Sequence, residues 1–163
     1  MTIREYRQIF ISRLIPVYGA DEAESFFYLA LESLTGMRRI DLALKPDTAL
    51  SAESELAWND VLSQLLQQVP IQYILGTTHF NGLEFKVTPA VLIPRPETEE
   101  LVDWVVQSAN IPNPNILDIG TGSGCIAISL AHRLIEATVS AMDVSADALQ
   151  IAKYNADANH VKV

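Results

Sequence analysis

Residues 1–70 repeat apolar side chains at three- and four-residue steps, which is the period of an amphipathic helix. The pattern predicts helices over residues 2–17, 22–35 and 38–44, and a longer helix that runs from a cap at Ser51 to residue 68. The apolar stripes of these helices have only one another to pack on. We therefore expect a small all-α bundle at the start of the chain.

Particular residues predict the ends and the inward faces of this bundle. Asp21 is expected to cap the second helix and Gly36 to close it, because a short acceptor side chain suits a helix start and glycine suits a left-handed end. Trp58 is expected in the core, not at a contact surface. The side chains predicted to face inward are Ile3, Tyr6, Phe10, Leu14, Val17, Phe26, Phe27, Ala30, Leu31, Leu34, Leu56, Val61, Leu62, Leu65 and Leu66.

Extended structure is predicted to replace the helices after residue 69. Asn81-Gly82 lies between two short apolar runs, which is a strong signal for a tight hairpin. Residues 91–93 form a further extended piece before Pro94. Pro96 then occupies a first helical position with glutamates in the first turn, and this predicts a helix to about residue 108. The residues that this helix is expected to bury are Leu101, Trp104 and Val105.

Residues 115–143 have the pattern of a strand, a glycine-rich loop, a helix and a second strand, which is one βαβ unit. The first apolar run, 116–119, is short enough for a strand buried on both faces. Residues 125–131 have the composition of a buried helix, and a second apolar run covers 137–142.

Gly120, Gly122 and Gly124 join the first strand to the helix. Glycine takes positive φ and lets a ligand approach bare backbone, and the helix that follows directs its N-terminal amides into the same crevice. Asp143 ends the next strand about twenty residues further on, where a ribose would offer two hydroxyls. Loop and acid together indicate a pocket for an adenosine-like ligand.

The spacing of the glycines separates the candidate cofactors. A dinucleotide fingerprint needs G-x-G-x-x-G, and Cys125 occupies the position of its third glycine. The pattern present is D-x-G-x-G-x-G, from Asp118 to Gly124, which resembles motif I of the Rossmann-like S-adenosylmethionine methyltransferases. S-adenosyl-L-methionine is the expected cofactor. A nicotinamide cofactor and a glycine-rich turn without any ligand stay open as alternatives.

Composition limits the classes of protein further. Apolar residues make up 49% of the chain, and eleven basic against twenty acidic residues give a net charge of −9. This balance argues against a nucleic-acid surface and suits a basic or amphipathic partner segment. The lone Cys125 excludes an internal disulfide, and we expect it to pack behind the loop as a small apolar residue. With no signal peptide or membrane span apparent, we expect a cytoplasmic protein.

Four segments identify a family. PIQYILG (70–76), FNGLEFKV (80–87), VLIPRPETEELV (91–102) and ILDIGTGSG (116–124) resemble the HemK/PrmC family of release-factor glutamine methyltransferases, in order and over essentially the whole chain. The resemblance implies an α/β fold with an N-terminal all-α domain. The domains expected on this basis are a helical substrate-recognition domain (1–70), a β-hairpin linker (71–95) and the first part of a Rossmann-like methyltransferase domain (96–163).

The resemblance also implies an activity in translation termination. It is the transfer of a methyl group from S-adenosyl-L-methionine to the side-chain amide of the glutamine in the Gly-Gly-Gln loop of peptide-chain release factors, which the helical domain helps to hold. Asp143 would take the ribose, and Asp118 would orient the loop or the methionine amine. The residues implied to bind the cofactor are Asp118, Gly120, Thr121, Gly122, Ser123, Gly124 and Asp143.

One motif of the family is missing from these residues. The family places Asn-Pro-Pro-Tyr after its fourth strand, where the Asn and a proline carbonyl bind the substrate amide, and residues 1–163 contain no such motif. An amide nitrogen is a poor nucleophile that needs fixed acceptors, so we expect a chain cut off partway through its catalytic domain and inactive alone. Arg95, Glu97 and Thr98 are expected to touch substrate at the mouth of the crevice, and we assign no catalytic residue and no metal ligand.

Two other functions stay open on the sequence. An adenine-specific DNA or RNA methyltransferase shares the Asn-Pro-Pro-Tyr chemistry, although the acidic balance opposes direct contact with nucleic acid. A binding module would use residues 1–70 to dock a partner and the rest as a scaffold. A βαβ unit with few strands leaves edges unpaired, so we expect self-association through them, and residues 161–163 resemble the start of a third strand.

Overall fold

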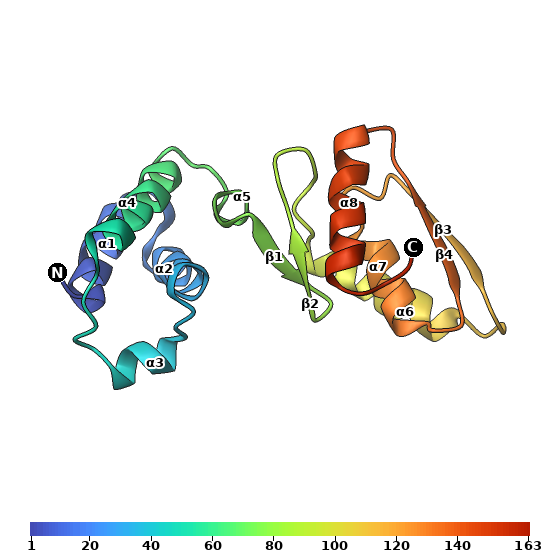
Figure 1. The fold of residues 1–163 in the computed structure, drawn as a ribbon, viewed down its shortest axis with the longest axis horizontal. Coiled ribbons are helices and arrows are strands. Elements are labelled where there is room, and N and C mark those ends of the chain that lie inside the picture. The colour runs from blue at the N-terminus through green and yellow to red at the C-terminus, as the bar shows by residue number, and fades with distance from the viewer. The chain divides into compact units, whose positions relative to one another are not determined.

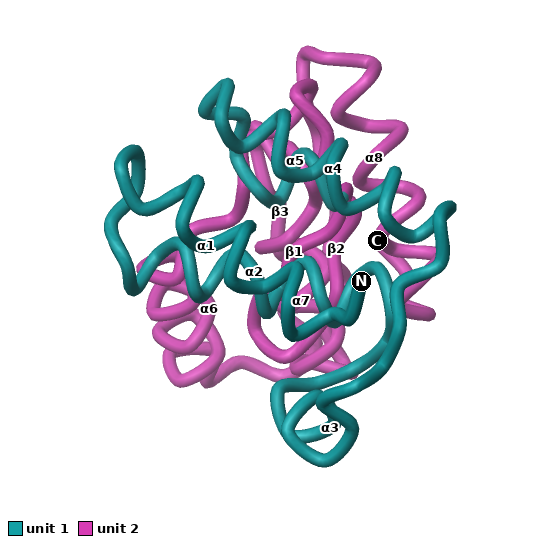
Figure 2. Tube along the Cα trace, turned by 90° about the vertical axis from the view of Figure 1, so that its left-hand side faces the viewer, with its two compact units in different colours: residues 1–75 teal, residues 76–163 magenta.

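The computed structural model describes residues 1–163, which divide into two compact units, Met1–Leu75 and Gly76–Val163 (Figure 2). Each unit has a hydrophobic core of its own. The hairpin, which the sequence places in a separate linker, belongs to the second unit. None of the helices has both the length and the apolar composition needed to cross a membrane.

The first unit is entirely helical, as predicted (Figure 1). The cap at Ser51 is confirmed, because its hydroxyl accepts the backbone N–H of Ser54 at 3.1 Å, and Gly36 closes the second helix with φ of 69°. The cap predicted at Asp21 is wrong, since that helix starts two residues earlier than predicted, at Ala20, after Gly19. The helices are α1 (Ile3–Tyr18), α2 (Ala20–Thr35), α3 (Arg39–Leu44), α4 (Ala52–Leu66) and α5 (Ile71–Leu75), of which α5 was not predicted.

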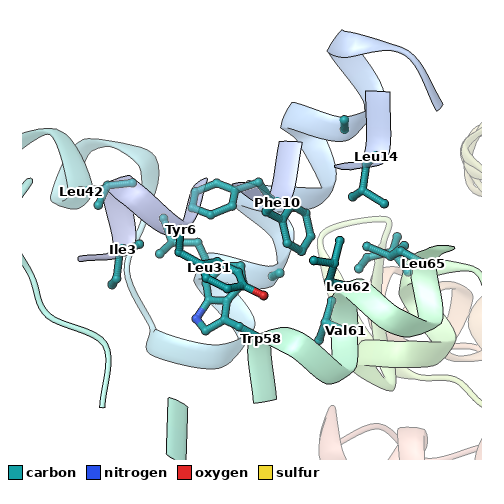
Figure 3. Packing of buried hydrophobic residues seen from close by; sticks show 14 residues of the cluster. Ile3, Tyr6, Phe10, Leu14, Leu31, Leu42, Trp58, Val61, Leu62 and Leu65 are labelled. Carbon is teal, nitrogen blue, oxygen red and sulfur yellow. The ribbon is translucent and has the colours of Figure 1, made fainter. Parts of the chain in front are cut away.

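Trp58 lies at the centre of the first core, as predicted (Figure 3). Its indole is fully buried, stacks on Phe27 at 5.1 Å between ring centroids and meets the edge of Phe10 at 5.7 Å. The buried stripe of α4 is narrower than predicted, because it continues from Trp58 in steps of three and four residues. Leu56 and Leu66 of α4, which were predicted to face inward, are therefore exposed. The same prediction is wrong for Val17 of α1 and Leu34 of α2, which are also exposed.

The second unit contains the hairpin and the predicted βαβ unit. Asn81 and Gly82 have φ of 50° and 78°, the left-handed pair that a two-residue hairpin turn requires. Strands β3 and β4 are parallel, in a register that pairs Asn115 with Thr138 and Ile119 with Met142. The elements are β1 (Thr77–Phe80), β2 (Leu83–Lys86), α6 (Pro96–Ser108), β3 (Asn115–Ile119), α7 (Cys125–Arg133), β4 (Thr138–Met142) and α8 (Ala146–Ala158).

Three predictions for the second unit are wrong. β3 is not buried on both faces, because Leu117 and Ile119 are 55% and 73% exposed on a side that no other element covers. Helix α6 buries Val102, whereas Leu101 and Trp104 lie on its exposed side. Residues 161–163 form no strand, since the N–H of Val161 bonds back to α8. Helix α8 itself was not predicted.

Candidate cofactor site

The glycine loop continues the pairing of the two parallel strands. The backbone N–H groups of Gly120 and Thr121 both donate to the carbonyl of Met142, at 2.8 and 3.0 Å, so the start of the loop is held to the end of β4. Gly120, Gly122 and Gly124 have φ of 80°, 55° and 82°. All three values lie in the left-handed region that glycine tolerates and other residues rarely adopt.

The three glycines differ in what surrounds them. A Cβ at Gly124 would lie 2.8 Å from Ile128 Cδ1 and 3.3 Å from the Cα of Ala152, so this glycine lets α8 pack close to the loop. A Cβ at Gly120 or Gly122 would meet nothing within 4 Å. The backbone of these two residues is therefore open to a ligand, as a cofactor loop requires.

Asp143 closes the loop from the tip of β4. One carboxylate oxygen, Oδ2, accepts the N–H of Gly122 at 2.9 Å, and the other, Oδ1, accepts the N–H of Ser145 at 2.9 Å. These backbone hydrogen bonds hold the pKa of the Asp143 carboxyl below its usual value. Because each carboxylate oxygen has a further acceptor position, the ionised group is still able to receive hydroxyl donors from a ligand.

Asp118 lies at the other side of the loop. Its Oδ2 accepts the hydroxyl proton of Thr121 at 2.7 Å, and Thr121 is itself buried. This bond fixes the second residue of the loop against the end of β3. The structure thus brings Asp118, Thr121, Gly122 and Asp143 into one hydrogen-bonded arrangement, and their contacts with a cofactor stay predictions.

Cys125, which follows the loop, is buried in the second core, and burial raises the pKa of its thiol. The prediction that it packs as a small apolar residue is confirmed. A buried thiol of raised pKa has little thiolate character, so Cys125 is unsuited to act as a nucleophile.

The three predicted substrate residues lie around the start of α6. Arg95 immediately precedes the helix and is exposed, as is Glu97, while Thr98 is partly buried and its N–H donates to the carbonyl of Arg95 at 2.9 Å. Contact of their side chains with a substrate stays a prediction. Sequence reasoning missed Glu99, whose Oε1 accepts the N–H of Asn81 at 2.9 Å and so ties α6 to the hairpin turn.

Sequence reasoning also missed Asn155. Its side chain is fully buried and contacts the glycine loop through the carbonyl of Ser123 at 2.8 Å. The spacing of residues in α8 could have predicted its burial. Ala148, Ala152 and Asn155 follow one another at steps of four and three, so the asparagine lies on the buried stripe of the helix.

Two parallel strands are joined by a glycine loop and a helix, with an ionised acid at the tip of the second strand. This is the arrangement of the first half of a Rossmann-like domain. Comparison with known families agrees. Residues 9–76 match the PrmC N-terminal domain, and residues 98–163 match the methyltransferase small domain. The chain thus matches these two domains in that order, and the two matched ranges do not overlap.

Three similar curated proteins carry the name release factor glutamine methyltransferase. The protein of that name from Flavobacterium psychrophilum is 50% identical over 167 aligned residues, which cover 100% of this chain and 59% of the relative. Those from Bacteroides thetaiotaomicron and Chlorobaculum tepidum are each 43% identical, over 85% and 86% of this chain and 50% of their own lengths. The chain thus spans between half and three fifths of these relatives.

Proposed function

We propose that this chain serves in the methylation of a glutamine side-chain amide in the Gly-Gly-Gln motif of peptide-chain release factors. In this proposal the second unit holds S-adenosyl-L-methionine and the helical unit holds the release factor. The names of the relatives support the substrate, and the match to the methyltransferase small domain supports the cofactor. The observation that carries the proposal is the bond from the Gly122 N–H to Asp143, which joins the loop and the acid of the cofactor pattern.

The residues of the loop fit the proposed cofactor. Asp143, ionised and with acceptor capacity to spare, would receive the two ribose hydroxyls. Gly120 and Gly122, with open space beside their α-carbons, would let the cofactor lie against bare backbone. Asp118 would attract the methionine amine while it holds Thr121. When bound, the cofactor supplies an electrophilic methyl group.

Transfer of the methyl group needs a second set of residues. A glutamine amide must be oriented by fixed acceptors before its nitrogen is an effective nucleophile. Arg95 only donates hydrogen bonds, and the exposed side chain of Glu97 lacks the fixed orientation of a backbone carbonyl. We therefore expect residues 1–163 to bind the cofactor without methylating a release factor.

The test measures transfer of labelled methyl to a release factor that carries Gly-Gly-Gln, with a Gln→Ala release factor as the control. Two proteins are compared: residues 1–163, and the same residues joined to the part of the Flavobacterium relative that the match leaves uncovered. We expect glutamine-dependent transfer by the chimera only. Transfer by residues 1–163 alone would refute the account of the missing acceptors. Transfer to DNA or RNA, and none to the release factor, would favour an adenine methyltransferase.

A further inference from the structure

Asn155 is a polar side chain at the centre of the second unit's packing. It is 0% exposed, and its amide makes three hydrogen bonds to backbone. Oδ1 accepts the N–H of Lys86 at 2.7 Å, and Nδ2 donates to the carbonyls of Lys86 at 3.0 Å and Ser123 at 2.8 Å. A buried amide destabilises a core unless it is satisfied, so these bonds account for its presence among apolar residues.

One of these bonds reaches the glycine loop. The carbonyl of Ser123 belongs to the peptide unit between Ser123 and Gly124, and a bond to it fixes the orientation of that peptide plane. The preceding residue, Gly122, is held through its N–H by Asp143. Two adjacent residues of the loop are therefore held by side chains: Gly122 by the carboxylate of Asp143, and Ser123 by the amide of Asn155.

The other two bonds reach the hairpin. Asn155 exchanges a donor and an acceptor with the same residue, Lys86, as an opposite residue does in an antiparallel strand pair. One helical turn later, Nδ2 of Asn159 donates to the carbonyl of Glu84 at 2.9 Å. The ammonium of Lys86 also lies 4.6 Å from the centre of the Tyr154 ring. Helix α8 runs alongside the hairpin in Figure 1. Side chains from α8 and its C-terminal end thus bond backbone groups of β2, as a neighbouring strand would.

We propose that Asn155 is a positioning residue that sets the shape of the cofactor loop and couples it to the β1–β2 hairpin. The proposal rests on the cofactor site proposed above, and Asn155 itself touches no cofactor in it. It acts by fixing the orientation of the Ser123–Gly124 peptide unit, next to the residue that Asp143 holds. A loop that loses this bond samples other peptide orientations and binds the cofactor less tightly.

The chain provides a matched control, because Asn155 and Asn159 both bind β2 from α8 but only Asn155 binds the loop. Asn155→Asp keeps the acceptor for the Lys86 N–H and removes both donors, and Asn155→Ala removes the amide without adding charge. Asn159→Ala removes one bond to the hairpin and one to the backbone carbonyl of Asn155, and neither of these bonds reaches the loop. In each 163-residue variant we would measure S-adenosylhomocysteine affinity by calorimetry and amide exchange at Gly122 and Gly124 by NMR.

We expect both Asn155 variants to lower the affinity by about tenfold and to speed loop exchange, and Asn159→Ala to change each by less than about twofold. Equal effects of the two positions, or an unchanged loop, would overturn the proposal, as would loss of the fold in both Asn155 variants. If the unmodified chain does not bind S-adenosylhomocysteine, the proposed cofactor fails. The exchange rates still decide the role of Asn155, because they report on loop order without a ligand.

Discussion

Asp143 and Gly122, 21 residues apart, are joined by a hydrogen bond of 2.9 Å from the glycine amide to the aspartate Oδ2. The bond links the end of β4 to the middle of the loop that follows β3. It makes one side chain responsible both for the shape of the loop and for the charge that a ribose would meet. Removal of that side chain therefore acts on the site in two ways.

Asp143→Ala is expected to weaken S-adenosylhomocysteine binding by about tenfold or more, because charge-assisted bonds to the ligand and the bond to Gly122 are lost together. Asp143→Asn keeps the acceptor oxygen but not the charge and should have a smaller effect. Calorimetry on both variants measures the difference. Binding that is unchanged in Asp143→Ala would remove this residue from the site.

Acid is expected to loosen the loop only at low pH. The folded-state pKa of Asp143 is lowered by its backbone bonds, so its stabilising contribution is fully present above the unfolded-state value, about 3.9, and is lost as pH falls through the folded-state value. The amide shift of Gly122, followed by NMR during an acid titration, should move below about pH 4 and stay constant above it. In Asp143→Asn the transition should disappear. A midpoint above the ordinary value for aspartate would contradict the geometry.

Trp58 should dominate the stability of the helical unit. Trp58→Ala removes a fully buried side chain and is expected to cost about 3–5 kcal/mol in the free energy of unfolding. Trp58→Phe should cost less, because the indole N–H is buried without a partner and no hydrogen bond is lost with it. Leu56→Ala, on the exposed side of the same helix, is the control and should change stability by about 0.5 kcal/mol or less. Chemical denaturation followed by circular dichroism measures all three, and a large effect at Leu56 would count against the assigned faces of α4.

Hydrogen exchange should separate the two units. Helices α1, α2 and α4 share a closed core, whereas β3 and β4 form a two-stranded sheet with one face uncovered. Amides in residues 2–68 are therefore expected to be more strongly protected than those in residues 115–160. Equal protection in both ranges would indicate a single cooperative unit.

Features governed by local chemistry were predictable from the sequence. The turn at Asn81-Gly82 needs two left-handed residues, and few pairs other than this one supply them. The D-x-G-x-G-x-G pattern gave the loop between β3 and α7, and the apolar run before Asp143 gave β4. The burial of Trp58 was expected because an aromatic side chain on an amphipathic helix is more often part of the core than of a contact surface.

Burial and long-range hydrogen bonds, which depend on the neighbours of a residue in the folded chain, were not predictable. Leu117 and Trp104 read as core residues because they are apolar, yet their exposure depends on whether another layer covers them. Glu99 and Asn155 read as surface residues because they are polar, yet each bonds a backbone group far away in the sequence. Only the tertiary arrangement brings a buried acceptor or donor to such a side chain.

The most direct test of the account is calorimetric titration of S-adenosylhomocysteine into the 163-residue chain and into Gly122→Val. The account predicts binding by the unmodified chain, no binding of a nicotinamide dinucleotide, and loss of binding in Gly122→Val, because a β-branched residue is strained at φ of 55° and fills the open side of the loop. Gly36→Val imposes similar strain at φ of 69° in the helical unit and should leave binding intact. Binding that survives Gly122→Val, or that prefers the dinucleotide, would contradict the assignment of the loop to S-adenosyl-L-methionine.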